Sequence, residues 1–132
     1  MEKPDLSGKS VLLVEDNEIN LEIAKMLLED EKMVVTTAEN GKEAVDIVSQ
    51  SVPGRFDFIF MDIMMPVMDG LEAARQIRTL NRKDTKEIPI ISMTANAFAE
   101  DVQVALNAGM DDHVAKPIDM GILISVITKY IE

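Results

Sequence analysis

Residues 10–31, SVLLVEDNEINLEIAKMLLEDE, change their hydrophobic period part-way along. The first five residues form a short apolar run that ends at the acidic pair Glu15 and Asp16, which predicts a strand buried on both faces. From residue 18 the apolar residues recur every three or four positions, which predicts an amphipathic helix with Asn17 as its N-cap. The face expected to turn inward consists of Ile19, Ile23, Ala24, Leu27 and Leu28.

The same change from strand to helix recurs along the rest of the chain. Strands are predicted at 34–38, 58–61, 89–93 and 113–115, and helices at 41–51, 70–79, 97–108 and 119–131. Gly109 stands just past a helix, where it suits a C-cap, and residues 81–87 are expected to be a polar connection. Alternating strands and helices pair in parallel with right-handed crossovers. We therefore expect an α/β fold, an open five-stranded parallel sheet with five helices on its two faces.

Length and composition restrict the class of protein. The chain has 132 residues with 47% hydrophobic and 28% charged, which indicates one folded domain with one core. The first nine residues are interpreted as a polar leader and residues 10–132 as the domain. The chain ends soon after the last predicted helix, so we expect it to act through a partner or to belong to something longer.

Several functions are disfavoured by the charge and by the rare residue types. A formal charge of -11 disfavours direct binding of nucleic acid or of an anionic membrane surface. The absence of Cys and the single His exclude disulfides, a thiol nucleophile and a multi-histidine metal site. The first ten residues have no apolar signal region, and no run of apolar residues is long enough to insert into a membrane. We expect a cytoplasmic protein.

Polar residues gather where the predicted strands end. Glu15 and Asp16 follow the first strand, Asp62 the third, Thr94 the fourth and Lys116 the fifth. Ligands of such sheets bind at the carboxyl ends of the strands. Like charges 4 Å apart repel by about 4 kcal/mol at an effective dielectric constant of 20, so three clustered carboxylates need a cation. Oxygen ligands suit Mg²⁺, with Mn²⁺ as a substitute.

A carboxylate beside Mg²⁺ is able to attack a phosphoryl group and form an aspartyl phosphate. Asp62 is the candidate nucleophile, with Lys116 and Thr94 as candidate phosphoryl contacts. An acidic pair after a strand is also typical of a simple charge complement to a helix N-terminus. A Mg²⁺-dependent phosphatase remains the alternative, although Met64 stands where such enzymes carry a second Asp. A flavin-binding electron carrier is disfavoured because Glu15 and Asp16 would repel the flavin phosphate.

The segments VLLVEDN, FIFMDIMMPVMDG, ISMTA and HVAKP resemble, in order and spacing, the signature segments of the receiver domain of two-component response regulators. The resemblance covers about residues 10–131 and implies a flavodoxin-like fold with strand order 2-1-3-4-5. LSGKS and MTANAFAED are similar to segments of receivers in hybrid sensor histidine kinases. The family is a phosphorylated switch in phosphorelays that loses phosphate slowly, rather than an enzyme.

The resemblance also implies roles for individual residues. Glu15 and Asp16 would be the acidic pair, and Asp16, Asp62 and the main-chain carbonyl of Met64 would bind Mg²⁺. Asp62 would accept a phosphoryl group from a phosphohistidine, so the partner would be a histidine kinase or a histidine phosphotransfer protein. The domain would be a monomer or a weak, phosphorylation-dependent dimer.

The resemblance further implies which residues would surround the phosphoryl group. Thr94 would be the switch hydroxyl, Ala95 the small residue that leaves the site open, and Lys116 the phosphoryl-binding lysine. The peptide before Pro117 is predicted to be cis, an arrangement that costs little only at X–Pro bonds. His113 departs from the family, which usually has Tyr or Phe at this switch position, and is equally interpreted as a half-exposed strand histidine with no signalling role.

Overall fold

The structure is a computed structural model that describes residues 6–63, 65, 67–80, 82–94, 99–115 and 119–130, with only the backbone at 94 and 99–102. Within these residues the strands and helices alternate as the sequence predicts, apart from one additional helix. The strands are β1 Ser10–Val14, β2 Val34–Ala38, β3 Phe58–Asp62, β4 Ile90–Thr94 and β5 Asp112–Ala115. The helices are α1 Glu18–Asp30, α2 Gly41–Gln50, α3 Gly70–Thr79, α4 Lys83–Glu87, α5 Ala99–Asn107 and α6 Met120–Thr128.

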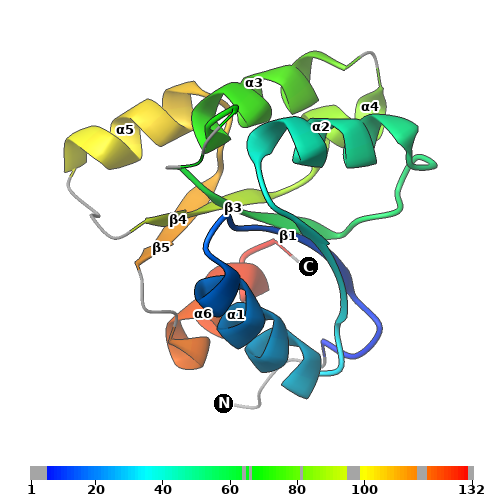
Figure 1. The fold of residues 1–132 in the computed structure, drawn as a ribbon, viewed down its shortest axis with the longest axis vertical. Coiled ribbons are helices and arrows are strands. Elements are labelled where there is room, and N and C mark those ends of the chain that lie inside the picture. Colours follow the sequence, from blue (N-terminus) through cyan, green and yellow to red (C-terminus); the bar gives the residue numbers. More distant parts are fainter. Residues whose placement is uncertain are drawn as a thin grey trace.

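The five strands form one parallel sheet in the order β2-β1-β3-β4-β5, which confirms the predicted topology. Figure 1 shows α1 and α6 on one face of the sheet and α2, α3, α4 and α5 on the other. The winding reverses between β1 and β3, because the chain moves from β1 outward to β2 and then returns to the other side of β1. The carboxyl ends of β1 and β3 therefore meet at the place where sheets of this kind bind ligands.

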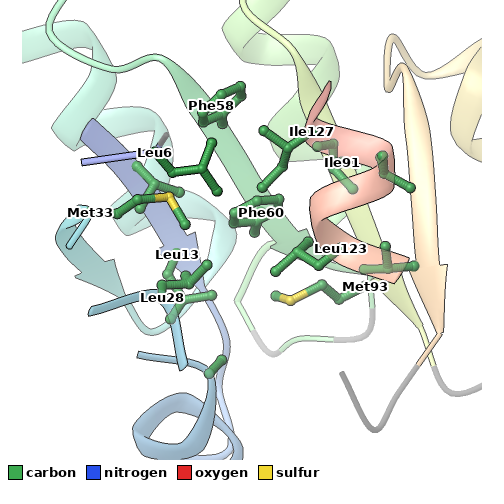
Figure 2. Close-up of a cluster of buried hydrophobic side chains, with 14 residues drawn as sticks. Leu6, Leu13, Leu28, Met33, Phe58, Phe60, Ile91, Met93, Leu123 and Ile127 are labelled. Atoms are coloured by element: carbon green, nitrogen blue, oxygen red, sulfur yellow. The ribbon is translucent and has the colours of Figure 1, made fainter. Parts of the chain in front are cut away.

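Successive side chains of each strand point to opposite faces of the sheet, so the interior is divided into two cores. On the face of α1 and α6, Phe58 and Phe60 of β3 stack with ring centroids 6.4 Å apart. Figure 2 shows Phe60 among the side chains of this core, with Leu13 of β1 and Leu123 of α6 on either side of it. The second core lies under α2, α3 and α5. Because both faces are covered, the residues between the ends of β1 and β3 are apolar on both faces.

Leu6 extends the first core beyond the predicted domain. Its side chain is 2% exposed and belongs to the same cluster as Met33 and Phe58. Gly8 and Lys9 hold the segment in place, since Gly8 donates a backbone hydrogen bond to Lys32 and Lys9 accepts one from Val34. The segment expected to be a polar leader thus contributes one apolar side chain to the interior.

The inward face of α1 differs from the prediction. Ala24 and Leu28 are buried, as expected, and Leu21 packs against the core. Ile19 and Ile23 were expected inside but are 71% and 48% exposed. The helix carries more apolar residues than one face can bury. The residues at positions 21, 24 and 28 face the sheet. Ile19, Ile23 and Met26 are left as an exposed apolar stripe.

A sixth helix replaces part of the connection expected at residues 81–87. It is the single turn α4, and Thr85 is its buried residue. The Thr85 hydroxyl donates to backbone carbonyls of Leu80 and Arg82, and Arg82 forms an ion pair with Asp84. These short-range contacts stabilise a turn that a purely polar sequence does not predict, so the expectation of five helices was wrong.

The predicted helix caps at Asn17 and Gly109 are confirmed. The side chain of Asn17 accepts a hydrogen bond from the backbone N–H of Asn20 at the start of α1. Gly109 has a φ of 103° just past the end of α5, a conformation that favours glycine. These caps fix the lengths of the helices and hence the positions of the loops that follow the strands.

Candidate functional site

Three carboxylates come together at the carboxyl ends of β1 and β3. Glu15, Asp16 and Asp62 each place a carboxylate oxygen within 4.8 Å of the others. Glu15 and Asp62 are buried at 2% and 5% exposure, whereas Asp16 is exposed. The three predicted carboxylates therefore form one group that is open to solvent on the side of Asp16. Their mutual repulsion favours a bound cation.

Glu15 is held by the chain around the end of β1. Its backbone N–H donates to the carbonyl of Ala38, which continues the pairing of β1 with β2. Its side-chain oxygen Oε1 accepts a hydrogen bond from the backbone N–H of Asn17. Asn17 in turn caps α1, so the acidic pair lies in a tight connection between the strand and the helix. These two hydrogen bonds hold Glu15 in a buried position while its carboxylate stays close to Asp16 and Asp62.

Asp62 is the last residue of β3, and a glycine closes the loop beyond it. Gly70, the first residue of α3, donates its backbone N–H to the carbonyl of Ile63 at 2.9 Å. A Cβ atom at position 70 would overlap the main-chain oxygen of Asp62, so only glycine allows this approach. Gly41 packs in the same way against the main-chain oxygen of Met68. Neither role was predicted from the sequence, although each glycine directly follows the residue that caps its helix, Asn40 or Asp69.

Asp69 lies outside the group of three carboxylates. Its side chain caps α3 by accepting a hydrogen bond from the backbone N–H of Glu72 at 2.8 Å. Among the described residues, the group that could hold a metal ion contains Glu15, Asp16 and Asp62. Asp69, the next acidic residue after Asp62 along the chain, thus has a structural role.

Several predicted site residues lie outside the described residues, namely Met64, Ala95, Lys116 and Pro117. The cis peptide predicted before Pro117 lies there as well. The backbone of Thr94 ends β4 and pairs in register with Ala115, while the side chain of Thr94 is not described. The carboxyl ends of β4 and β5 are therefore adjacent.

His113 lies in β5, where it is half-buried. Its ring nitrogen Nδ1 is 3.7 Å from Asp112 Oδ1, which is too long for a hydrogen bond. Asp112 is occupied by other groups, since it accepts hydrogen bonds from the His113 backbone N–H, the Lys129 ammonium and the Tyr130 hydroxyl. These bonds outweigh the effect of burial and hold the pKa of Asp112 below its ordinary value. Burial and the neighbouring Asp112 raise the pKa of Tyr130 to about 12.

The donor atoms of the acidic group suit a hard divalent cation. All three side chains offer carboxylate oxygen, and Mg²⁺ binds oxygen ligands, takes few of them from protein and keeps several waters. Exposure of Asp16 leaves one side open to water and to a second oxygen-rich molecule. The residues present therefore fit a magnesium site.

Comparison with known families agrees with this geometry. The sequence profile of the response regulator receiver domain matches residues 11–128. The chain belongs to this family. The matched receiver domain includes all five strands except the first residue of β1, and it includes the complete acidic group.

The curated relatives compared include several hybrid histidine kinases. This receiver domain is 40% identical over 130 residues to hybrid signal transduction histidine kinase I of Dictyostelium discoideum, with 94% of this chain and 8% of the kinase aligned. Across the curated relatives compared, the chain spans 7% to 16% of their length. The similarity thus concerns one domain of much longer proteins.

Two solved structures are similar in fold and in sequence. The receiver domain of a sensor histidine kinase from Pseudomonas aeruginosa PAO1, which has a magnesium ion coordinated in its active site cleft, is 35% identical with a TM-score of 0.83 and coverage of 94% and 98%. The other is a Saccharomyces cerevisiae complex of a histidine phosphotransfer protein with the receiver domain of its downstream response regulator. This receiver is 33% identical with a TM-score of 0.81 and coverage of 95% and 90%. Among the described residues of the present receiver domain, no helix is both long and apolar enough to cross a bilayer.

Proposed function

We propose that this receiver domain accepts a phosphoryl group on Asp62 from a phosphohistidine, with Mg²⁺ held at the acidic group, and that phosphorylation changes its affinity for a partner. The observation that carries the proposal is the position of Asp62, buried at the end of β3 within 4.8 Å of two further carboxylates. The partner would be a histidine kinase or a histidine phosphotransfer protein, as in the yeast complex.

The transfer needs one bond to form and one to break. An Asp62 carboxylate oxygen would bond to phosphorus while the bond between phosphorus and the donor imidazole nitrogen breaks. The electron pair stays on that nitrogen, which takes up a proton from water, and the product is an acyl phosphate. Because Asp62 ends a central strand and its loop is closed by Gly70, its carboxylate is held for attack by a rigid part of the fold.

The metal would be bound by Asp16 and Asp62, with Glu15 beside them and the main-chain carbonyl of Met64 as a further proposed ligand. When bound, Mg²⁺ supplies positive charge that neutralises the carboxylates and the phosphoryl oxygens. Thr94, Ala95 and Lys116 are proposed to surround the phosphoryl group. The peptide before Pro117 is proposed to be cis, which would turn Lys116 into the site.

Magnesium should stabilise the folded receiver domain, because the unfolded chain has no preformed site. At a concentration one hundred times the dissociation constant, the gain is about 2.7 kcal/mol. Asp16→Asn should lose most of it, and Asp30→Asn, which changes an acidic residue at the far end of α1, should retain it. Thermal unfolding with and without Mg²⁺ measures the difference. An equal melting shift in both variants would place the metal elsewhere.

The exposed stripe of α1 provides a docking surface for the phosphodonor. Ile19, Ile23 and Met26 recur at intervals of four and three residues along one side of the helix, and all are about half exposed or more. The helix begins two residues after Asp16, so the stripe starts next to the acidic group. A donor that covers these side chains would bring its phosphohistidine to the carboxyl edge of the sheet.

A substitution in this stripe distinguishes an effect on donor docking from an effect on phosphoryl transfer to Asp62. Ile23→Asp should slow transfer from a phosphorylated histidine phosphotransfer protein about tenfold, the effect of losing one buried apolar contact at an interface. Phosphorylation by acetyl phosphate should be unchanged, because a small donor needs no docking surface. The control is Val52→Asp, an equal change at a 71% exposed residue that follows α2. Helix α2 lies on the face of the sheet opposite α1 (Figure 1). If Ile23→Asp and Val52→Asp behave alike with the protein donor, α1 is not the docking surface.

A further inference from the structure

Met26, in α1, has the side chain most open to solvent among the methionines that the structure describes. It is 56% exposed. Met65, Met68 and Met120 are half-buried and pack against the two cores. The other described methionines are at most 4% exposed, namely Met33, Met61, Met93 and Met110. A reagent dissolved in water therefore reaches the sulfur of Met26 before it reaches the buried ones.

The position of Met26 along α1 places it in the stripe proposed to dock the phosphodonor. It follows Ile23 by three residues and Ile19 by seven. Seven residues make about two turns of an α-helix, so Met26 and Ile19 lie on the same side of the helix. A donor that covers the two isoleucines therefore covers the thioether as well. A change in the polarity of Met26 then changes the polarity of that interface.

The charges around Met26 indicate which class of oxidant reaches it. Glu22 and Asp30 lie about one helical turn before and after it, and both are exposed. Their carboxylates, in a chain with a formal charge of -11, repel an anionic oxidant. Hydrogen peroxide is uncharged near neutral pH and small enough to reach a thioether on the surface. A neutral peroxide is therefore the oxidant that fits this position.

We propose that Met26 is a site of reversible oxidation by hydrogen peroxide, and that its sulfoxide weakens the docking of the phosphodonor. A lone pair of the sulfur attacks one peroxide oxygen, so a sulfur–oxygen bond forms while the oxygen–oxygen bond breaks. The sulfur loses two electrons to the peroxide. The proton on the transferred oxygen passes to the departing hydroxide, which leaves as water. The effect on docking, though not the oxidation itself, rests on the proposed function of the α1 stripe.

The sulfoxide changes the docking surface without changing the fold. Its oxygen is a polar acceptor, and an apolar partner that covers it leaves it without a hydrogen bond, which lowers the affinity. The helix packs on the sheet through Leu21, Ala24 and Leu28, and the thioether of Met26 is outside this contact. Oxidation therefore slows transfer from a protein donor and leaves phosphorylation by a small donor unchanged.

Treatment of the receiver domain with hydrogen peroxide, followed by catalase to remove the excess, tests both steps. Trypsin cleaves after Lys25 and Lys32, so Met26 and Met33 lie in separate peptides. Mass spectrometry should find one added oxygen atom on the Met26 peptide well before it finds one on the Met33 peptide. Transfer from a phosphorylated histidine phosphotransfer protein should slow about tenfold, as for Ile23→Asp, and acetyl phosphate should act at the same rate as before. Methionine sulfoxide reductases for both sulfoxide epimers should restore the transfer rate.

A pair of variants shows whether the slower transfer comes from Met26 or from another methionine. Met26→Leu removes the sulfur and keeps an apolar side chain of similar size. Its transfer rate after peroxide should equal its own rate before peroxide. The matched control is Met120→Leu, at a half-buried methionine of α6, and peroxide should slow this variant as it slows the wild type. Equal slowing of the two variants would overturn the proposal.

The untreated Ile23→Asp variant distinguishes a failure of this inference from a failure of the docking surface. If Met26 is oxidised and transfer does not slow, control by oxidation is wrong. The docking surface still stands if Ile23→Asp slows transfer, and it is wrong as well if Ile23→Asp does not. Oxidation of Met26 no faster than that of buried Met33 would overturn the inference at its first step.

Discussion

Incubated with acetyl phosphate and Mg²⁺, the wild-type receiver domain should gain one phosphoryl group, and Asp62→Asn should gain none. Asp62 is the buried member of the acidic group that ends β3, and an amide oxygen at this position is too weak a nucleophile to attack phosphorus. Intact-mass spectrometry measures the gain. Hydroxylamine should remove the group, because it cleaves acyl phosphates.

The matched control for this experiment is Asp69→Asn. Asp69 lies seven residues further along the chain, but its carboxylate caps α3, and asparagine caps helices as well as aspartate does. This variant should be phosphorylated like the wild type. Incorporation in Asp62→Asn equal to that in the control would place the acceptor at another residue.

The position of the acidic group was predictable because it depends on topology rather than on side-chain packing. Short apolar runs fixed the strands, and alternation with helices made the sheet parallel. Residues that directly follow strands of such a sheet must meet at one edge, whatever packs around them. Glu15, Asp16 and Asp62 therefore came together as expected.

The inward face of α1 was not predictable in the same way. Seven of its thirteen residues are apolar, so several stripes satisfy the helical period. The choice among them depends on the direction from which the sheet meets the helix, which is a property of the tertiary structure. Leu21 packs against the core, whereas Ile19 and Ile23 remain exposed to solvent.

The hydrogen bonds of individual side chains were also beyond the sequence pattern. The turn α4 depends on side-chain bonds of Thr85 and Arg82, and residues 81–87 have no apolar period that would predict it. The deciding fact is which side chains bond to one another, and no hydrophobic period predicts it.

Gly70→Ala should destabilise the receiver domain by about 3 kcal/mol, the upper part of the usual range for overpacking a rigid interior. The added Cβ would overlap the main-chain oxygen of Asp62, and backbone cannot move aside as a flexible side chain can. Urea denaturation measures the loss as a lower midpoint with an unchanged slope. Gly121→Ala is the control, because its new Cβ would meet only the side chain of Asp119, and its stability should stay within about 1 kcal/mol of the wild type.

Gly70→Ala also tests whether the loop that Gly70 closes positions the proposed phosphoryl acceptor, Asp62. If the chain relieves the overlap by moving Asp62, its carboxylate leaves the group formed with Glu15 and Asp16. Gly70→Ala that is still folded should then lose the stabilisation by Mg²⁺ and the gain of a phosphoryl group together. Retention of both in a destabilised variant would mean that α3 moved instead of β3, and that Asp62 is positioned by the strand alone.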